Sequence, residues 1–205
     1  SEQSSYEINI KTFNRLQHTI TGWPGGKPHA DDTNRPERAE PAKKRVIIFS
    51  PHPDDDVISM GGTFDRLVSQ GHEVHIVYQT SGNIAVADHE ALKIAEVANA
   101  ISRTAIFGEV IKEIKAKTAE DYDSEIVRKV KGTIRRSESY GATRYMGIPD
   151  SQVHFLDLPF YETGTIKKNP LGEKDIQIMN DIIEKIKPHQ IHVVSQGKIR
   201  VPGSL

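Results

Sequence analysis

A short apolar run followed at once by ionisable side chains does most to limit what this chain can fold into. The run Val46–Phe49 is β-branched and aromatic, is unbroken by polar residues, and is bounded by Lys43-Lys44-Arg45 and Pro51. Such a run is typical of a strand buried on both faces, which belongs in the middle of a parallel sheet. Ligands of open α/β sheets bind just outside the carboxyl ends of the strands, so a site is expected directly after this run.

The segment at that position holds one imidazole and three carboxylates, punctuated by two prolines: Pro51-His52-Pro53-Asp54-Asp55-Asp56. Imidazole and carboxylate suit zinc and similar divalent metals. The prolines stiffen the turn, which lowers the entropy cost of holding ligands in place. A divalent cation would remove the repulsion among the carboxylates, and a carboxylate left off the metal can serve as general base. The alternative is a polar loop whose acids cap the next helix, because Asp is a favoured N-cap.

The segment 51–56 resembles the signature of the PIG-L/LmbE family of metal-dependent N-deacetylases, which usually reads A/P-H-P-D-D-E, with Asp56 here in place of the Glu. The resemblance implies a zinc cofactor, with His52 and Asp55 as ligands and Asp54 as general base. It also implies a reaction, the hydrolysis of an N-acetyl group on a small-molecule substrate, an amino sugar or sugar conjugate.

Composition excludes several other classes of function. The 205 residues suffice for one sizeable core, and 27 Lys+Arg against 28 Asp+Glu give a net charge of -1, so we expect no nucleic-acid partner. The absence of cysteine excludes disulfides and thiolate metal sites, which leaves His, Asp and Glu as metal ligands. No apolar run approaches the roughly 20 residues of a membrane span, and the N-terminus lacks a signal-peptide pattern. We therefore expect a cytoplasmic protein.

Residues 1–43 are expected to be an arm or linker, because glycine and proline interrupt them too often for regular elements. Within them Ile8–Leu16 fits a short strand or one or two helical turns, and Trp23 is the expected anchor. The stretch Thr21–Pro28 and its lead into the first strand are similar to the junction in bacterial two-domain proteins. Those proteins carry a glucosamine-6-phosphate deaminase-like domain before a PIG-L-like domain. The resemblance implies that 44–205 is such a second domain, and that a deaminase-like domain is a candidate partner.

The remaining pattern predicts an α/β fold of three layers, a mostly parallel, Rossmann-like sheet with helices on both faces. Apolar residues with a spacing of three and four predict helices after Gly61-Gly62, across much of 89–147 and over Ile176–Ile186. The part from Ser102 to Asp123 is expected to be a solvated helical or mobile excursion. Three further strands are predicted, at Glu73–Thr80, Val153–Pro159 and Ile191–Val194.

Two residues outside the acidic segment are predicted to bind substrate. Arg135 and Glu138 match the R-x-x-E pattern of the PIG-L/LmbE family, in which the arginine contacts substrate. The alternative is an exposed helix face, on which such charge pairs are common. Asp157 lies near the carboxyl end of a predicted strand, which in that family ends beside the substrate pocket.

The third metal ligand of the family, a histidine just after the last strand, has no counterpart here, since no histidine follows His192. His189 precedes that strand and His192 lies within it, so neither is a convincing ligand. A catalytic zinc typically takes three protein ligands. Three interpretations stay open: the chain is truncated at its C-terminus and needs further residues, a ligand comes from elsewhere, or the domain is a catalytically impaired binding or regulatory module.

Overall fold

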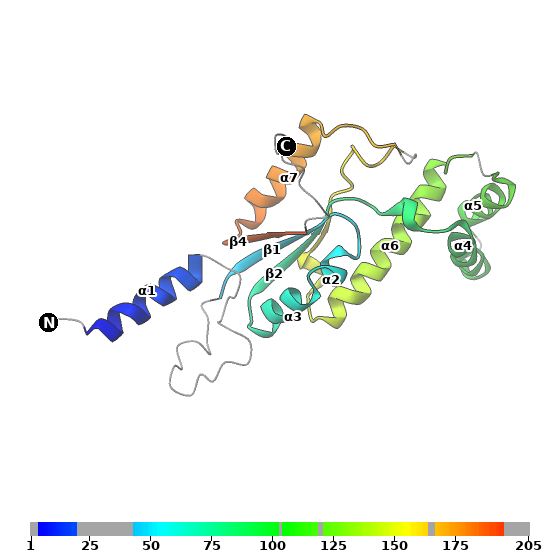
Figure 1. Ribbon diagram of the computed structural model, residues 1–205. Coiled ribbons are helices and arrows are strands. Elements are labelled where there is room, and N and C mark those ends of the chain that lie inside the picture. Colours follow the sequence, from blue (N-terminus) through cyan, green and yellow to red (C-terminus); the bar gives the residue numbers. More distant parts are fainter. Residues whose placement is uncertain (1–3, 20–42, 103, 119–120, 164–166, 195–205) are drawn as a thin grey trace, which may run out of the picture.

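The computed structural model describes residues 4–19, 43–102, 104–118, 121–163 and 167–194 (Figure 1). Its centre is a parallel sheet with the strand order β3-β2-β1-β4. The two central strands are β1 (Arg45–Ser50) and β2 (Glu73–Tyr78), and the outer two are β3 (Val153–Phe155) and β4 (Gln190–Val193). The apolar run 46–49 is almost completely buried, which confirms that it forms a central strand.

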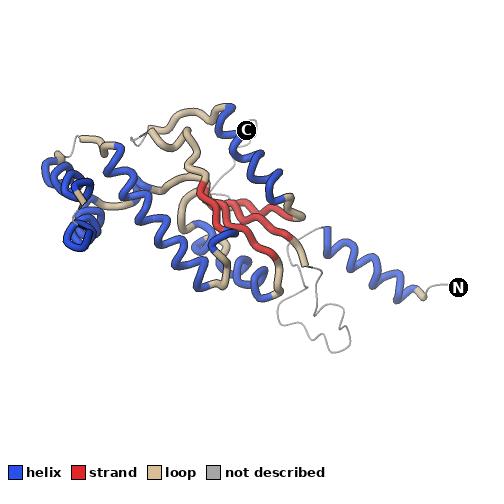
Figure 2. The backbone as a smooth tube through the Cα atoms, turned by 180° about the vertical axis from the view of Figure 1, so that it is seen from behind, coloured by secondary structure: helices blue, strands red, loops and turns tan. Residues whose placement is uncertain are grey.

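Helices cover both faces of this sheet, which confirms the predicted three-layer α/β architecture (Figure 2). On one face, α3 (Gly61–Ser69) and the C-terminal half of α6 (Glu125–Tyr145) pack against alternate residues of β1 and β2. On the other face, α7 (Glu173–Ile186) packs Ile182 and Ile186 against the remaining ones, such as Ile47. Because side chains alternate along a strand, each central strand supplies both cores.

A third apolar cluster lies away from the sheet, where α4 (Asp88–Ser102) and α5 (Ala105–Ala116) pack on the N-terminal half of α6 (Figure 1). The predicted excursion is therefore helical, but it is packed rather than simply solvated, since Val110 and Ile114 are buried. The Lys131 ammonium is buried beneath this cluster and bridges Asp88 and Asp123 at 2.5 and 2.7 Å. A buried charge is tolerated there because it is fully paired.

The ends of the elements differ in detail from the sequence-based expectations. Before the sheet, α1 (Ser5–Thr19) is a helix of 15 residues, longer than the one or two turns that the sequence suggested. Strand β3 is shorter than predicted, so Asp157 lies beyond its end. Trp23 and residues 195–205 lie outside the described residues. None of the described helices is both long enough and apolar enough to cross a bilayer.

Candidate active site

The acidic segment forms a tight turn between β1 and a short helix, α2 (Asp55–Ile58). The Ser50 hydroxyl donates to the His52 carbonyl at 2.6 Å and accepts the Asp56 backbone N–H at 3.0 Å, which closes the turn. Thr80, after the neighbouring strand, donates to the Pro51 carbonyl at 2.7 Å. The turn is therefore clamped from two strands and not by its prolines alone.

Asp56 points into the protein rather than toward the site. Its side chain is fully buried and accepts the Tyr78 hydroxyl at 2.9 Å. Burial raises the pKa of Asp56 above its ordinary value, although the hydrogen bonds from Tyr78 and Ser50 oppose that shift. Asp56 thus anchors the turn to β2, and the sequence pattern gave no signal that separated this carboxylate from its two neighbours.

His52 and Asp55 lie together at the mouth of β1. The Asp55 carboxylate oxygen Oδ2 lies 3.1 Å from His52 Nδ1 and also accepts the His52 backbone N–H at 3.0 Å. The imidazole is 38% exposed, whereas the Asp55 side chain is 9% exposed. The ring edge of Tyr161 lies against the imidazole, with centroids 5.8 Å apart. This places an imidazole nitrogen and a carboxylate oxygen side by side on a partly open surface.

Asp54 and Arg135 also meet. Arg135 reaches across from α6 and donates from Nη2 to Asp54 Oδ2 at 2.8 Å, and to the Pro53 carbonyl through a short hydrogen bond. Its other nitrogen pairs with Glu138 at 2.7 Å. The Arg135 side chain is 16% exposed and the Asp54 side chain 43%. Arg135 thus contacts the acidic turn. It also pairs with Glu138, which is the contact expected of an exposed charge pair on the helix surface.

Asp157 does not join this group, because its contact in the structure is an ion pair with the neighbouring Arg136. Its backbone has a φ of 45°, a conformation that is uncommon outside glycine. Its second carboxylate oxygen, Oδ1, is buried without a hydrogen-bond partner among the described residues. The two adjacent arginines of α6 therefore serve two places, Asp54 and Asp157.

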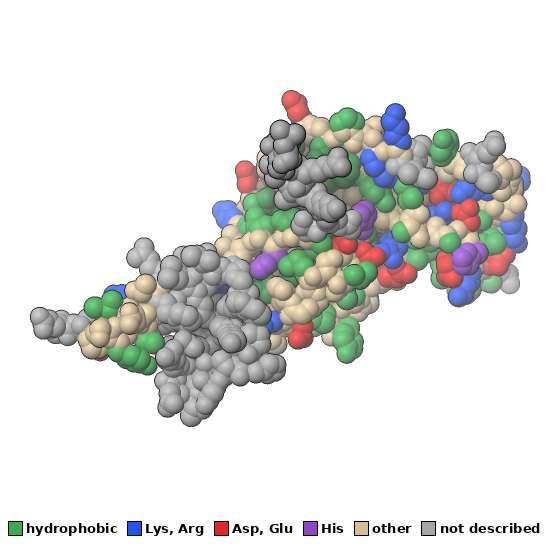
Figure 3. Space-filling model, viewed as in Figure 1, with side chains coloured by type: hydrophobic (Ala, Val, Ile, Leu, Met, Phe, Trp, Pro, Cys, Tyr) green, Lys and Arg blue, Asp and Glu red, His purple; other side chains and the backbone are tan. Residues whose placement is uncertain are grey.

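Glu162 lies in the loop after β3. Its carboxylate accepts the Ser81 N–H at 3.3 Å and the Asn83 side-chain amide at 3.0 Å. These contacts tie the loop after β3 to the turn after β2. Figure 3 shows acidic, basic and histidine side chains together on the face between α7 and α6.

A known protein family matches most of this chain. The family model described as PIG-L, GlcNAc-PI de-N-acetylase, matches residues 47–202. The chain belongs to the PIG-L family. The PIG-L match thus includes the acidic turn, Arg135 and Asp157, and the resemblance stated from the sequence is confirmed.

The chain is also similar to several individual proteins. The chain is 56% identical over 200 residues to a glucosamine-6-phosphate deaminase-like protein of Bacteroides thetaiotaomicron, covering 93% of this chain and 30% of that protein. It is 26% identical over 161 residues to diacetylchitobiose deacetylase of Thermococcus kodakarensis, covering 74% of this chain and 58% of that enzyme. A solved N,N'-diacetylchitobiose deacetylase from Pyrococcus horikoshii aligns with a TM-score of 0.47 and 20% identity, over 93% of this chain and 50% of that one. The chain spans less than two thirds of each.

The acidic turn brings together two donor atoms of the kind that zinc binds. His52 Nδ1 and Asp55 Oδ2 converge, and nitrogen with oxygen is a donor set that zinc accepts. Among residues 43–194, as far as they are described, no group of three His, Cys, Asp or Glu side chains could hold a metal. The two predicted ligands thus fit zinc in chemistry and proximity, and a third protein ligand is not found within the described part of the chain.

The other histidines lie elsewhere. His189 accepts the Arg45 backbone N–H at 2.9 Å, at the amino end of the sheet and away from the acidic turn. His192 lies within β4, and its buried Nε2 has no partner among the described residues. His89 is 79% exposed on α4 and pairs with Glu90. His75 is a buried histidine of β2.

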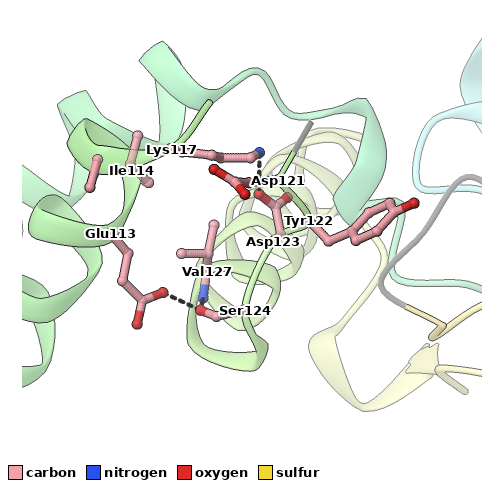
Figure 4. Close-up of a pocket in the computed structure, with 9 residues that line it drawn as sticks. Glu113, Ile114, Lys117, Asp121, Tyr122, Asp123, Ser124 and Val127 are labelled. Atoms are coloured by element: carbon pink, nitrogen blue, oxygen red, sulfur yellow. Dashed lines mark hydrogen bonds and ion pairs between the residues drawn. The ribbon is translucent and has the colours of Figure 1, made fainter. Parts of the chain in front are cut away.

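A separate pocket of about 320 Å3 lies between α5 and the start of α6 (Figure 4). Its polar groups bond to one another: Lys117 pairs with Asp123 at 2.6 Å, and Ser124 donates to Glu113 through a short hydrogen bond. Ser124 also caps α6 by accepting the Val127 N–H at 3.4 Å. These contacts serve the packing of the helices, and none of the residues predicted for catalysis lines this pocket.

Proposed function

We propose that this PIG-L domain is a zinc-dependent N-deacetylase that removes the acetyl group from an amino sugar or sugar conjugate. The observation that supports it is the convergence of His52 and Asp55 at 3.1 Å beside Asp54, at the carboxyl end of the central strand. The deacetylase names within the family and among the relatives support the choice of an acetylated sugar amine. A chain without cysteine also suits the proposed cytoplasmic location.

His52 and Asp55 are the residues that would hold the metal. Zinc, when bound, polarises an acyl carbonyl and lowers the pKa of a bound water to about 7. His52 offers an imidazole nitrogen from a partly exposed ring, and the mostly buried Asp55 fixes the direction of that ring. Tyr161 limits the space on one side of the imidazole.

Asp54 is the proposed general base. The reaction adds water to the acetamido carbon and breaks the bond from that carbon to nitrogen, which gives acetate and a free amine. The Asp54 carboxylate accepts the proton that the water loses and passes it to the departing nitrogen. Arg135 holds Oδ2 of this carboxylate at 2.8 Å, so the second oxygen, Oδ1, is available to the water. Arg135 thus orients the base.

A second candidate function is a binding or regulatory module that keeps the site without turnover. The observation in its favour is that the described residues supply two of the three protein ligands that a catalytic zinc typically has. A third is a domain whose activity needs the rest of a longer protein, because the deaminase-like relative matches over only 30% of its length. In that protein a deaminase-like domain is the proposed partner.

The decisive experiment measures zinc content and acetate release on the same sample. The purified chain is titrated with zinc and then incubated with N-acetylglucosamine and with N,N'-diacetylchitobiose. The proposal expects one zinc per chain and acetate from at least one sugar. Folded protein that stays free of zinc supports the module instead. Hydrolysis that returns only in a chain extended beyond Leu205 supports the third candidate.

A further inference from the structure

Two adjacent residues of the loop after β3, Tyr161 and Glu162, contact two different parts of the candidate site. The Tyr161 ring meets the His52 imidazole at an interplanar angle of 64°, with centroids 5.8 Å apart. The Glu162 carboxylate accepts the Ser81 N–H at 3.3 Å and the Asn83 side-chain amide at 3.0 Å. One dipeptide thus touches both a proposed metal ligand and the turn after β2.

The turn 81–83 is packed directly against the acidic turn. Gly82 lies at its centre, and a Cβ built there would lie 2.8 Å from Pro53 Cδ and 3.4 Å from Arg135 Nε. Because closely packed groups transmit strain, a displacement of Gly82 displaces Pro53 or Arg135 as well. Glu162 binds the residues on both sides of Gly82, so it sets how closely this turn approaches the site.

The partners of Glu162 are buried, so water does not replace a lost contact. Asn83 is 2% exposed, and the two N–H groups of its amide donate to Glu162 Oε2 at 3.0 Å and to Ser81 Oγ at 2.8 Å. A buried donor that loses its acceptor carries the full cost of its desolvation. The Glu162 carboxylate therefore favours a single position of the turn 81–83.

Arg135 carries this restraint to the proposed general base. Its Nη2 donates to Asp54 Oδ2 at 2.8 Å and, through a short hydrogen bond, to the Pro53 carbonyl. Arg135 thus lies between the turn that Glu162 holds and the carboxylate that is proposed to accept the proton. Within the described part of the chain Glu162 forms no hydrogen bond or ion pair with Arg135 or Asp54, so its restraint on the base passes through the turn 81–83.

Lys168 restrains the same dipeptide. Its ammonium lies 3.5 Å from the centroid of the Tyr161 ring and donates to the Tyr161 carbonyl at 3.2 Å. Burial lowers the pKa of Lys168, whereas the negative charge of Glu162 opposes that shift. Since a cation over an aromatic ring is attracted to it, Lys168 stabilises the position of Tyr161 beside His52.

We propose that Tyr161 and Glu162 are positioning residues that align the two halves of the candidate site. Tyr161 holds the proposed ligand His52 in place, and Glu162 holds the proposed base Asp54 in place through the turn 81–83. Neither residue touches the reacting atoms. The inference rests on the proposed function for the roles of His52 and Asp54. It deepens that function by assigning the alignment of metal ligand and base to one dipeptide.

Acetate release from the zinc-loaded protein tests the role of Glu162. Glu162→Asp keeps the charge but withdraws the carboxylate by one methylene, and Glu162→Gln keeps the shape but replaces one acceptor by a donor. In both variants kcat is expected to fall about 10- to 100-fold, while KM stays within twofold, because a misplaced catalytic group loses rate and not substrate binding. Full kcat in Glu162→Asp overturns this role, because a purely electrostatic effect would depend on the charge alone.

Glu113→Gln is the matched control for the Glu162 variants. The Glu113 carboxylate also joins two segments, by accepting the Ser124 hydroxyl, but it does so between α5 and the start of α6. Its kcat should stay within twofold of wild type. A fall in Glu113→Gln as large as that in Glu162→Gln overturns the inference, because the loss would then follow from any broken contact between segments.

Calorimetric zinc titration tests the role of Tyr161. Tyr161→Leu is expected to weaken zinc binding about tenfold, since groups that orient a metal-ligating histidine contribute roughly 10- to 100-fold. Glu162→Gln should bind zinc as the wild type does, and so should Tyr145→Leu, which removes a ring that is 91% exposed. Unchanged zinc affinity in Tyr161→Leu overturns the role of Tyr161.

A double-variant cycle tests the coupling without zinc or substrate. Urea unfolding compares Glu162→Gln, Arg135→Lys and the variant that carries both. Changes at independent sites add, whereas positioning through the turn 81–83 predicts that the double variant loses clearly less stability than the two single variants together. Additive losses overturn the inference even where the wild type releases acetate. Coupled losses support it even where the proposed reaction does not occur.

Discussion

His52 Nδ1 lies 3.1 Å from Asp55 Oδ2, and the same oxygen accepts the His52 backbone N–H. The Asp55 carboxylate holds the His52 imidazole in place and is itself a proposed metal ligand. Asp55→Asn should therefore remove one ligand and also leave the imidazole ring less firmly oriented. We expect zinc affinity to fall at least about 100-fold, since changes that merely support a ligand cost roughly 10- to 100-fold. Calorimetric zinc titration measures this. Asp65→Asn, on the exposed side of α3, is the control and should bind zinc as the wild type does.

The Arg135–Asp54 pair leads to a second prediction, on catalysis. Arg135→Lys keeps the charge but loses the planar guanidinium, which holds Asp54 and the Pro53 carbonyl through Nη2 and Glu138 through Nη1. We expect kcat to fall about 10- to 100-fold, because a misplaced catalytic group loses rate of that order, and KM to change less. Steady-state acetate release checks both constants.

Arg144→Lys is the matched control for Arg135→Lys, because Arg144 also pairs with a carboxylate, Asp150, but on an exposed surface. Its kcat should stay within twofold of wild type. Should Arg135→Lys also keep its full kcat, the orienting role of Arg135 is wrong, and the pair is an ordinary surface contact.

The sequence predicted the parts of this fold that depend on local pattern. The unbroken run 46–49 identified the central strand because burial on both faces leaves no polar position. Hydrophobic periodicity and the short links of parallel βαβ units predicted the two strands that flank this central strand. The same signals predicted the helices that pack on them. The contact between Arg135 and the acidic turn joins residues 81 positions apart, and only the family resemblance pointed to it.

What the sequence could not predict depends on where side chains point in three dimensions. Three adjacent aspartates look alike in the chain, yet Asp56 is buried against Tyr78 while Asp54 faces Arg135. The direction of each aspartate side chain is set by helix α2, which begins at Asp55, and by the hydrogen bond of Ser50 to the Asp56 backbone. The spacing of residues in the sequence does not reveal either of these. Asp157 stays a predicted substrate contact, and its ion pair with Arg136, beyond the early end of β3, is a contact that the sequence did not indicate.

Gly82 allows a third prediction, on stability. Its φ of 65° lies in the left-handed region, and an added Cβ would lie 2.8 Å from Pro53 Cδ. Gly82→Ala should therefore lower the free energy of unfolding by about 1–3 kcal/mol and shift the acidic turn. Gly141→Ala is the contrasting variant, because that helical glycine has open space around it and should gain up to about 1 kcal/mol. Urea unfolding of both gives the comparison, and equal effects would refute the account of Gly82.

The last prediction concerns pH, and it arises on the α7 face of the sheet. His75 Nδ1 lies 3.0 Å from His154 Nε2, and His75 Nε2 lies 3.0 Å from Glu73. Burial, together with the charges of His75 and Lys185, lowers the pKa of His154 to about 4. The folded protein therefore binds fewer protons than the unfolded chain between pH 6.5 and 4, and its stability falls as the pH falls through that window.

His154→Gln removes this proton uptake and isolates its contribution. Between pH 7 and 4.5 the wild type should lose about 2 kcal/mol more unfolding free energy than the variant does. The comparison matters because burial raises the pKa of Asp56, which changes stability with pH in the opposite direction. Urea unfolding across this range measures the difference, with His89→Gln on an exposed helix as the control. Parallel pH profiles for wild type and His154→Gln would mean that His154 titrates normally and that the imidazole pair does not hold it neutral.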